Sequence, residues 1–349
     1  MRILIATDAW RPQINGVVHT LEQMSAAART QGVDIAFVTP EGFRTFPMPT
    51  YSEIRLALAS WGEVARRVDA AQADHIHIAT EGPIGLAARQ HCQRTRRAFT
   101  TSYHTRFPEY ISARAHIPES WSYAVLRRFH APAAAVMAPT PSIASDLTRR
   151  GFARVKVWSR GVDHSRFYPH RSEALDLPRP IFLYVGRVAT EKNLEAFLRL
   201  KLPGSKAIIG DGPARASLAA KYPDAHFLGS RSGAALADSF AGADVFVFPS
   251  RTDTFGIVMI EALASGLPVA GFPVPGPIDV IGDSGAGVLS EDLGAACLAA
   301  LEIPREAARA HSLQFTWAES ARQFLGNIVA GRTQTAAPLA KTLALLREG

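Results

Sequence analysis

The sequence predicts an α/β protein made of two doubly wound domains in tandem, each built on a parallel sheet. Short apolar runs alternate with helical patterns along most of the 349 residues, which is typical of parallel sheets covered by helices. Two such series follow one another, separated by a stretch rich in His, Arg and Pro. Glycine-containing loops come directly after several apolar runs, where this class of fold binds its ligands.

The first series holds six candidate strands. They lie at residues 2–7, 34–39, 75–79, 98–103, 135–138 and 156–158. Helical patterns lie between them, for example at 20–31 and 84–94. We therefore expect residues 1–165 to form the first domain.

The second series begins with the strongest strand candidate, at residues 181–185. It continues at 206–209, 226–228, 245–248 and 268–271. We expect a linker at 163–179, a second domain at 166–314, and a C-terminal helix and tail at 315–349 that cross back to the first domain. The last regular helix is expected at 317–328. Because doubly wound domains bind ligands at the carboxyl ends of their strands, two such domains are expected to face a central cleft that holds the site.

Composition narrows the class of protein. Hydrophobic residues make up 47% of the chain and charged residues 20%, as in a soluble globular protein. We expect no signal peptide, because the N-terminus turns polar at Asp8, and no transmembrane helix, because no window of about 18 apolar residues occurs. Cys92 and Cys297 belong to no C-x-x-C pair, which fits a reducing cytoplasm and excludes a disulfide framework.

Charge is distributed unevenly along the chain. Residues 1–170 hold 21 Lys and Arg against 13 Asp and Glu, a net charge of +8. Residues 171–349 hold 17 against 18, a net charge of −1. The positive field therefore belongs to the N-terminal half, where it favours an anionic partner.

Glu261 is the acidic residue with the most unusual surroundings. It is the only charged residue between Asp253 and Asp279, and it shares an apolar helical stripe with Ile257 and Ile260. A carboxylate there is unfavourable unless it is paired or hydrogen-bonded. Glu261 is thus either a functional carboxylate or one half of a structural ion pair with a distant Arg.

One basic glycine loop follows the strongest strand candidate. Gly186 and Arg187 come directly after that strand, and Lys192 precedes the next helix. A strand, a glycine, two cations and a helix start make a diphosphate receptor, in which Arg187 can bind two oxygens and Lys192 acts as a point charge. The alternative is a solvated basic turn.

Two further glycine loops carry weaker signals. Gly16 and Val17 lie about eight residues past the first strand, and Gly210 and Gly212 follow a strand of the second series. Glycine lets a phosphate or ligand approach the main chain. Neither loop has the G-x-G-x-x-G or Walker A spacing, so ordinary turns are the alternative.

A fourth loop leads into the helix that carries Glu261. Phe255 and Gly256 precede this helix, whose free N–H groups can face an anion. Asp253 lies eight residues before Glu261, so both carboxylates can face one ligand. Asp253 could instead cap the helix.

Three histidines are candidates for catalysis or metal binding. His104 lies where the fourth strand should end, and could donate to a substrate hydroxyl or relay a proton. His75 and His77 place two imidazoles on one strand face, but no third ligand is evident nearby, so we expect no metal site.

Cations and aromatic residues interleave in the first half of the chain. They are Arg114, Trp121, Tyr123, Arg127, Arg128 and Phe129. Such a pattern suits an anionic membrane surface, with a plain solvated face as the alternative. No nucleic-acid-binding module is recognisable, so we expect no nucleic acid partner.

These motifs together resemble the family 4 glycosyltransferases over nearly the whole chain. The most specific segment is 250–269, which is similar to the E-x7-E element of that family; segments 158–163, 186–193 and 210–213 also match. The resemblance implies the GT-B fold, with two Rossmann-like domains, and a retaining transfer of a hexose from a nucleotide-sugar. It implies no metal ion and no other cofactor.

The resemblance also implies roles for individual residues. Counterparts of Arg187 and Lys192 hold the diphosphate, that of Glu261 holds the ribose, and that of His104 lies beside the transferred sugar. The implied catalytic residues are His104, Arg187, Lys192 and Asp253. The implied donor-binding residues are Gly16, Val17, Arg160, Gly186, Gly212, Phe255, Gly256, Ile257 and Glu261. The first acid of the E-x7-E element is Asp253 here, one methylene shorter, which changes its reach toward sugar hydroxyls; Arg160 would favour an anionic sugar.

Within the family, segments 80–83 and 103–110 resemble two overlapping sets of enzymes. One set is the bacterial α-mannosyltransferases that use GDP-mannose, and the other glycosylates diacylglycerol or similar lipids from UDP-sugars, sulfoquinovosyltransferases included. The basic first half favours a membrane lipid acceptor and peripheral association with the inner face of the membrane. A non-lipid glycan acceptor, a GT-B nucleotide-sugar epimerase and a catalytically silent binding module are the alternatives.

Overall fold

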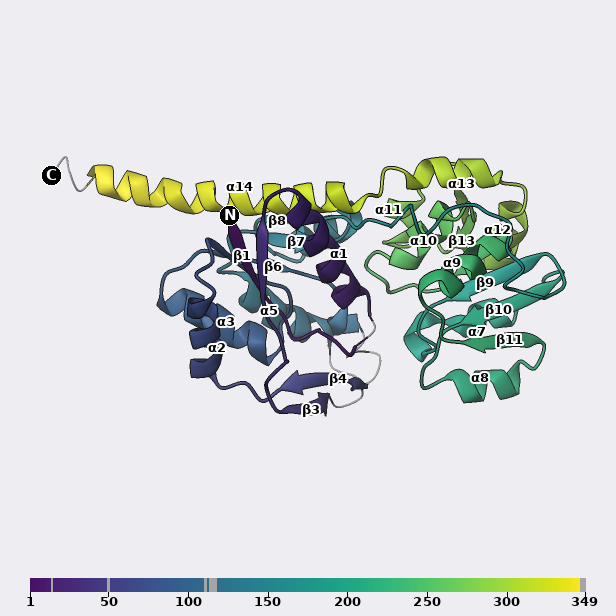
Figure 1. Cartoon of the computed structure of the whole chain (residues 1–349), viewed down its shortest axis with the longest axis horizontal. Coiled ribbons are helices and arrows are strands. Elements are labelled where there is room, and N and C mark those ends of the chain that lie inside the picture. The colour runs from purple at the N-terminus through teal and green to yellow at the C-terminus, as the bar shows by residue number, and fades with distance from the viewer. Residues whose placement is uncertain (14, 49–50, 110–111, 113–117, 346–349) are drawn as a thin grey trace. The chain divides into compact units, whose positions relative to one another are not determined.

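The chain divides into two compact units. Unit 1 comprises residues 1–159 and 317–349, and unit 2 comprises residues 160–316. The computed structural model describes residues 1–13, 15–48, 51–109, 112 and 118–345. The sequence-based boundaries lay after residues 165 and 314, close to these divisions. Figure 1 colours the chain from its N-terminus to its C-terminus.

Unit 1 contains a parallel sheet with the strand order β2-β1-β5-β6-β7-β8. Its strands are β1 (Arg2–Ala6), β2 (Asp34–Val38), β5 (His75–Ile78), β6 (Phe99–Ser102), β7 (Val136–Ala138) and β8 (Val155–Val157). All six predicted strands of the first series are confirmed. An antiparallel hairpin of β3 (Thr45–Met48) and β4 (Tyr51–Ala57) was not predicted, because Pro47 argues against a strand.

Helices cover both faces of this sheet. They are α1 (Gly16–Thr30), α2 (Trp61–Ala70), α3 (Pro83–Arg94), α5 (Glu119–His130), α6 (Pro141–Arg149) and α14 (Trp317–Leu345). Strand β1 sends Ile3 and Ile5 to the face covered by α1 and α14, and Leu4 and Ala6 to the face covered by α2 and α3. Burial on both faces is what makes parallel strands read as continuous apolar runs.

Unit 2 repeats the same architecture with the strand order β11-β10-β9-β12-β13-β14. Its strands are β9 (Ile181–Val185), β10 (Ser205–Ile209), β11 (Ala225–Gly229), β12 (Val245–Phe248), β13 (Val269–Gly271) and β14 (Gly287–Leu289). The five predicted strands are confirmed, and the three-residue β14 was missed. The helical segments are η1 (Thr190–Lys192), α7 (Leu194–Leu198), α8 (Arg215–Lys221), α9 (Gly233–Gly242), α10 (Ile257–Ala264), α11 (Pro277–Val280), α12 (Leu293–Ala300) and α13 (Arg305–Ser312).

The predicted linker at 163–179 is wrong. These residues belong to unit 2, and Phe167 and Leu175 are buried in the core that also holds β9 residues Leu183 and Val185. The apolar side chains of this stretch are too widely spaced to give a helical or strand period. They are nevertheless held in place by burial in the core. Weak periodicity therefore indicated irregular backbone correctly, but not a connection between domains.

His75 and His77 serve the sheet of unit 1. Both are buried, and their rings hydrogen-bond to hydroxyls on the neighbouring strand β6: His75 to Thr100 at 3.0 Å, and His77 to Thr100 at 2.8 Å and Ser102 at 2.6 Å. A buried polar group is tolerated when it is hydrogen-bonded in this way. These histidines therefore link β5 to β6 by side-chain hydrogen bonds.

The C-terminal helix α14 is part of unit 1 and extends well beyond the predicted 317–328. Phe324 is fully buried, and its ring lies 4.9 Å from those of Trp158 and His77. The Trp158 indole donates to the Ser320 hydroxyl at 3.1 Å. In Figure 1, α14 (yellow) lies beside α1 and β6. The helix thus covers part of one face of the unit 1 sheet.

Replacing Phe324 by Ala should lower the free energy of unfolding by about 3–5 kcal/mol, because it leaves a cavity against Trp158. Urea denaturation measures the loss. Val329→Ala on the same helix is the control: Val329 is 53% exposed, and its replacement should change stability by less than about 0.5 kcal/mol. Equal effects of the two changes would contradict the packing of α14 on this face.

Candidate functional site

The candidate site lies at the carboxyl edge of the unit 2 sheet, where the strand order reverses. Strand β9 pairs with β10 on one side and β12 on the other. The chain runs from β9 outward through β10 to β11, and then returns to β12 on the opposite side. Loops that leave neighbouring strands in opposite directions open a crevice at this point. The loops after β9 and β12 carry most of the predicted site residues.

Three contacts join the loops after β9 and β12. The Lys192 ammonium pairs with the Asp253 carboxylate at 2.5 Å. The side-chain amide of Asn193 donates to the Pro249 carbonyl at 3.0 Å, and the Thr252 hydroxyl donates to the Glu191 carbonyl at 3.3 Å. Both charged partners keep about a fifth of their side-chain surface exposed. An anionic ligand can therefore reach the ammonium without unfolding of the loops.

Arg187 is held at the start of the loop after β9. Its guanidinium lies 3.3 Å from the Glu191 carboxylate, and its carbonyl accepts from the Tyr184 hydroxyl at 2.8 Å. Its side chain is 29% exposed. Arg187 and Lys192 thus present two cations on one loop, next to Gly186, at the end of β9.

The glycine loop after β10 packs tightly against this cationic loop. The Val188 amide donates to the Asp211 carbonyl at 2.9 Å. A Cβ on Gly212, whose φ is +156°, would lie 2.4 Å from the Val188 carbonyl oxygen. Only glycine allows this approach of two backbones. Gly212 therefore shapes the loop that carries Arg187.

Helix α10 begins at the end of the loop that carries Asp253. Its N-cap is Gly256, with φ of +81°, and no side chain caps it. Asp253 pairs with Lys192 instead, so the alternative that Asp253 caps this helix is wrong. Phe255 is buried in the unit 2 core and fixes the turn, and Ile257 is the first residue of the helix. The uncapped N-terminus of α10 leaves a positive end of the dipole at this edge.

Glu261 lies in the second turn of α10 and is buried, with 8% of its surface exposed. Burial raises the pKa of its carboxyl to about 7, and the positive charge of Arg166 lowers the pKa in part. Since burial outweighs the nearby cation, Glu261 is not a fully compensated structural ion pair. A buried carboxylate that costs stability, at the edge where the cations lie, is typical of a functional group.

Arg160 is the first residue of unit 2. It is buried, and burial lowers the pKa of its guanidinium. Its role as a donor-binding residue stays a prediction.

In the Gly16 loop of unit 1, a side chain already caps the free amides at the start of α1. Asn15 is the N-cap of α1, and its side-chain oxygen Oδ1 accepts from the backbone amides of Val17 and Val18 at 3.0 Å each. Asn is among the best N-cap residues, so this arrangement is readable from the sequence. A ligand phosphate that used the Val17 amide would have to displace the cap.

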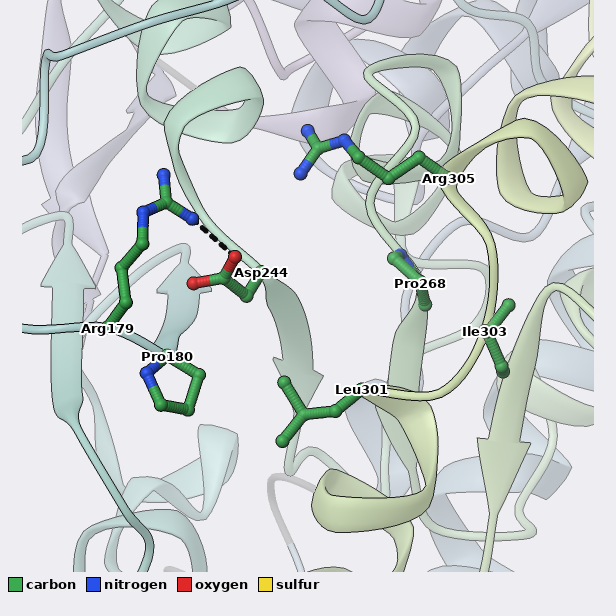
Figure 2. A pocket seen from close by; sticks show the side chains of 7 residues that line it. All are labelled: Arg179, Pro180, Asp244, Pro268, Leu301, Ile303 and Arg305. Atoms are coloured by element: carbon green, nitrogen blue, oxygen red, sulfur yellow. Dashed lines mark hydrogen bonds and ion pairs between the residues drawn. The ribbon is translucent and has the colours of Figure 1, made fainter.

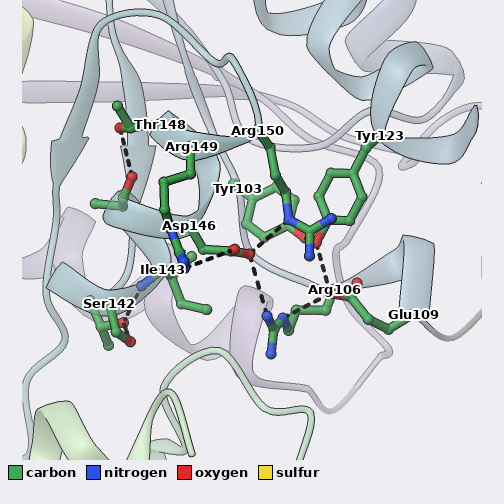
Figure 3. Close-up of polar contacts among 12 residues, drawn as sticks. Tyr103, Arg106, Glu109, Tyr123, Ser142, Ile143, Asp146, Thr148, Arg149 and Arg150 are labelled. Atoms are coloured by element: carbon green, nitrogen blue, oxygen red, sulfur yellow. Dashed lines mark hydrogen bonds and ion pairs between the residues drawn. The ribbon is translucent and has the colours of Figure 1, made fainter. Parts of the chain in front are cut away.

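His104 follows β6 in unit 1, and its ring packs edge-on against Trp158 at 5.7 Å. The segment after it is anchored by Arg106, which lies 3.1 Å from Glu109 and 3.5 Å from Asp146 (Figure 3). The Arg150 guanidinium also pairs with the Asp146 carboxylate, at 2.9 Å. This network fixes the strand end that carries His104.

Part of the same motif lies outside the described residues. Tyr110, which belongs to the matching segment 103–110, and Arg114 of the basic and aromatic pattern are both in this category. Tyr123 and Phe129 of that pattern are buried, whereas Trp121 is 71% exposed.

A separate cavity of about 330 Å³ lies at the amino ends of β9, β12 and β13. Arg179 pairs with Asp244 there (Figure 2). Arg305 donates to the carbonyls of Ala243 at 2.8 Å and Ala241 at 2.9 Å. Both arginines of the cavity therefore bind groups of the protein itself. The cavity lies at the opposite edge of the sheet from Arg187 and Lys192.

Sequence reasoning did not include three residues in the candidate site. Asn193 adopts a left-handed conformation with φ of +54° and ties the two loops together; Asn is the residue other than glycine that does so most readily, so this was a readable signal. Glu191 pairs with Arg187 and orients it, and the positive charge of Arg166 lowers the pKa of Glu261. Only the tertiary packing brings Arg166 near Glu261, so the sequence carries no signal for this effect.

The fold and this cationic edge define a glycosyltransferase of the GT-B type. The Glycosyltransferase Family 4 profile matches residues 14–166, and the Glycosyl transferases group 1 profile matches residues 179–303. The chain belongs to the family 4 glycosyltransferases.

Relatives span both kinds of enzyme suggested by the sequence. A GDP-mannose-dependent alpha-mannosyltransferase of Mycobacterium tuberculosis is 30% identical over 83% of this chain and 83% of its own length. A sulfoquinovosyl transferase of Arabidopsis thaliana is 32% identical over 69% of this chain, but the match spans only half of that protein. An alpha-monoglucosyldiacylglycerol synthase of Streptococcus pneumoniae is 24% identical over 86% of this chain and 78% of its own length.

Solved structures support the fold. A sucrose-phosphate synthase from Thermosynechococcus elongatus superimposes with a TM-score of 0.75 over 96% of this chain and 99% of its own, at 20% identity. Among the described residues, no helix has both the length and the apolar character needed to span a membrane.

Glu261 should make stability depend on pH. Its folded pKa of about 7 lies above the usual value of 4.5, so the folded state binds more protons than the unfolded state between these values. The free energy of unfolding therefore falls as pH rises through this window, by roughly 3 kcal/mol. Glu261→Gln should abolish that fall, which urea denaturation at pH 5 and pH 8 measures.

The matched control is Glu302→Gln, an exposed carboxyl in the same unit, which should leave the pH dependence unchanged. If wild type and Glu261→Gln lost stability equally between the two pH values, Glu261 would not be desolvated in the folded protein.

Proposed function

We propose that the protein is a retaining hexosyltransferase that moves a sugar from a UDP-sugar or GDP-mannose to a hydroxyl of a membrane lipid. The observation that carries this proposal is the meeting of Arg187, Lys192 and Asp253 at the carboxyl edge of unit 2. Helix α10, with its uncapped N-terminus and the buried Glu261, begins at the same edge.

The cations would act on the diphosphate of the donor. Charge grows on the leaving diphosphate as the glycosidic bond breaks, and preorganised cations stabilise it more in the transition state than in the ground state. Arg187 can bind two phosphate oxygens and Lys192 one. Because Lys192 pairs with Asp253 at 2.5 Å, donor binding would exchange this partner for a phosphate and release Asp253 toward the sugar hydroxyls.

Glu261 would bind the ribose of the nucleotide. A carboxylate accepts hydrogen bonds from two adjacent hydroxyls, and only its ionised form accepts from both. Since its pKa is raised to about 7, donor affinity should increase as pH rises through neutrality. Its role is binding, whereas the charge stabilisation lies with Arg187 and Lys192.

Several assignments rest on the family resemblance. His104 would orient the transferred sugar, and the leaving phosphate would take the acceptor proton in a front-face reaction. The Gly16 and Val17 loop and Arg160 would contact the donor, with Arg160 favouring an anionic sugar. The name of the alpha-monoglucosyldiacylglycerol synthase supports a lipid acceptor. The name of the sulfoquinovosyl transferase supports a sulfonated sugar, and that of the GDP-mannose-dependent relatives supports a mannosyl donor.

Unit 1 would meet the membrane. It holds 23 Lys and Arg against 14 Asp and Glu, a net charge of +9, whereas unit 2 holds 15 against 17, a net charge of −2. On α5, Trp121 and Val125 are 71% and 68% exposed, and Arg128 continues the same face at i+7. Exposed apolar side chains beside cations suit an anionic lipid surface.

The proposal is tested by a matrix of UDP- and GDP-sugars, including uronic and sulfonated sugars, against diacylglycerol, glycolipids and soluble glycans. Nucleotide release and labelled product are read together. Product formation with one donor and a lipid acceptor supports the proposal. Conversion of a donor without any acceptor would assign an epimerase, and binding without nucleotide release would assign a silent binding module.

Lys192→Ala should lower turnover about 100-fold or more, as the loss of a charge-stabilising donor does elsewhere. Lys221→Ala is the control, because Lys221 pairs with Glu195 on the surface of the same unit and should leave turnover unchanged. A loss of less than about threefold in Lys192→Ala would rule out the assigned role.

Trp121→Ser should weaken binding to vesicles that contain phosphatidylglycerol about tenfold, because it removes an exposed apolar anchor. Vesicle co-sedimentation measures the change. Trp61→Ser on α2, where Trp61 is 50% exposed, is the control. Equal losses in both variants would contradict the assignment of the membrane face to α5.

A further inference from the structure

Unit 1 contains a groove that the donor site does not explain. Its volume is about 870 Å³, within the range of small-molecule sites. It lies between α1, the loops after β1 and β2, and the β3–β4 hairpin. We name it the α1 groove; Trp10, Gln13, Ser25, Phe37, Glu41 and Arg55 are among its lining residues.

An aromatic pair forms one wall of the α1 groove. The rings of Trp10 and Phe37 lie 4.5 Å apart at 40°, and both are partly buried against the core of unit 1. A partly exposed indole fixed in this way offers a rigid flat surface to a ligand at low cost in side-chain entropy. Such a surface suits stacking by the apolar face of a ligand ring.

Ser25 supplies a polar group inside the α1 groove. It is 1% exposed, and its hydroxyl has no hydrogen-bond partner within the part of the chain that the structure describes. A serine within a helix either points to solvent or donates to the carbonyl four residues earlier. A buried hydroxyl that forgoes this bond, in the wall of a groove, is a site for a ligand hydrogen bond.

The rim of the groove offers donors and acceptors together. Arg29 donates to the Ile35 carbonyl at 3.0 Å, and Arg55 donates to the Thr45 carbonyl at 3.0 Å, which fixes both guanidinium groups. Glu22, paired with Arg11 at 2.5 Å, and Glu41 add carboxylates. The lining thus holds three arginines and two glutamates, and this mixture of donors and acceptors suits a sugar hydroxyl, which both donates and accepts.

We propose that the α1 groove binds a saccharide, and that the acceptor of this enzyme therefore carries a sugar. The groove opens at the carboxyl edge of the unit 1 sheet, beside the Gly16 loop: the Gln13 side chain accepts from Asn15 at 3.1 Å, and Asn15 caps α1. The sugar would stack on Trp10 and bond to Ser25. The acceptor role rests on the proposed transferase function, but saccharide binding does not.

The binding test uses the indole N–H signals of the five tryptophans in the full chain. The Trp10 signal is assigned by its loss in Trp10→Phe. Titration with methyl α-D-glucopyranoside and methyl α-D-mannopyranoside should shift this signal and leave those of Trp61 and Trp121 in place. Ser25→Ala should reduce the shift.

Inorganic phosphate is the opposing probe. If phosphate shifts the Trp10 signal and neither glycoside does, the groove is an anion site and the proposal is overturned. If no probe shifts it, the groove is not a saccharide site either. Neither result depends on catalysis, so both are separate from a failure of the transferase function, which would be seen as no nucleotide release from any donor.

The kinetic test compares a glycosylated lipid, a free oligosaccharide and diacylglycerol as acceptors. Trp10→Ala should raise KM about tenfold for acceptors that carry a sugar, with kcat little changed. Donor hydrolysis in the absence of acceptor should not change. The relative effect on glycolipid and free oligosaccharide tells which of them the wild-type enzyme uses. Trp61→Ala is the control, and an equal KM increase for diacylglycerol would overturn the saccharide assignment.

Discussion

The reversal of strand order beside β9 is the constraint on which the candidate site depends. Because β9 pairs in parallel with both β10 and β12, the loops that leave β9 and β12 start as neighbours. Three contacts then join them: Lys192 to Asp253, Asn193 to Pro249, and Thr252 to Glu191. Residues separated by about sixty positions in sequence become a single charged surface for this topological reason.

Unit 1 uses the same device with different chemistry. Its strand order reverses beside β1, which pairs with β2 and β5. There the buried Asp8 carboxylate accepts from the Ile84 amide at 2.8 Å and the Thr80 hydroxyl at 2.9 Å, at the start of α3. Burial raises the pKa of Asp8, while these hydrogen bonds lower it. These hydrogen bonds tie β1 to the start of α3, so Asp8 serves the fold, whereas burial of the Glu261 carboxyl is offset in part by the positive charge of Arg166.

The strands and the charged residues of the candidate site could be predicted from the sequence, because they depend on local signals. Buried parallel strands read as apolar runs, and Glu261 stood out as one charge in an apolar helix. The Lys192–Asp253 pair was not predictable, since 61 residues separate the partners. The linker was misread because the core contributions of Phe167 and Leu175 have no period, and the hairpin was missed because Pro47 interrupts β3. The α1 groove depends on that hairpin, so it could not be predicted from the sequence.

The most direct test of the account is a crystal structure of the protein with a nucleoside diphosphate. We expect the diphosphate at the carboxyl edge of unit 2, with Arg187 and Lys192 on its oxygens, the ribose hydroxyls on Glu261, and the Lys192–Asp253 pair opened. A diphosphate bound away from Arg187 and Lys192, or a ribose with no contact to Glu261, would contradict the central claim that this edge is the donor site.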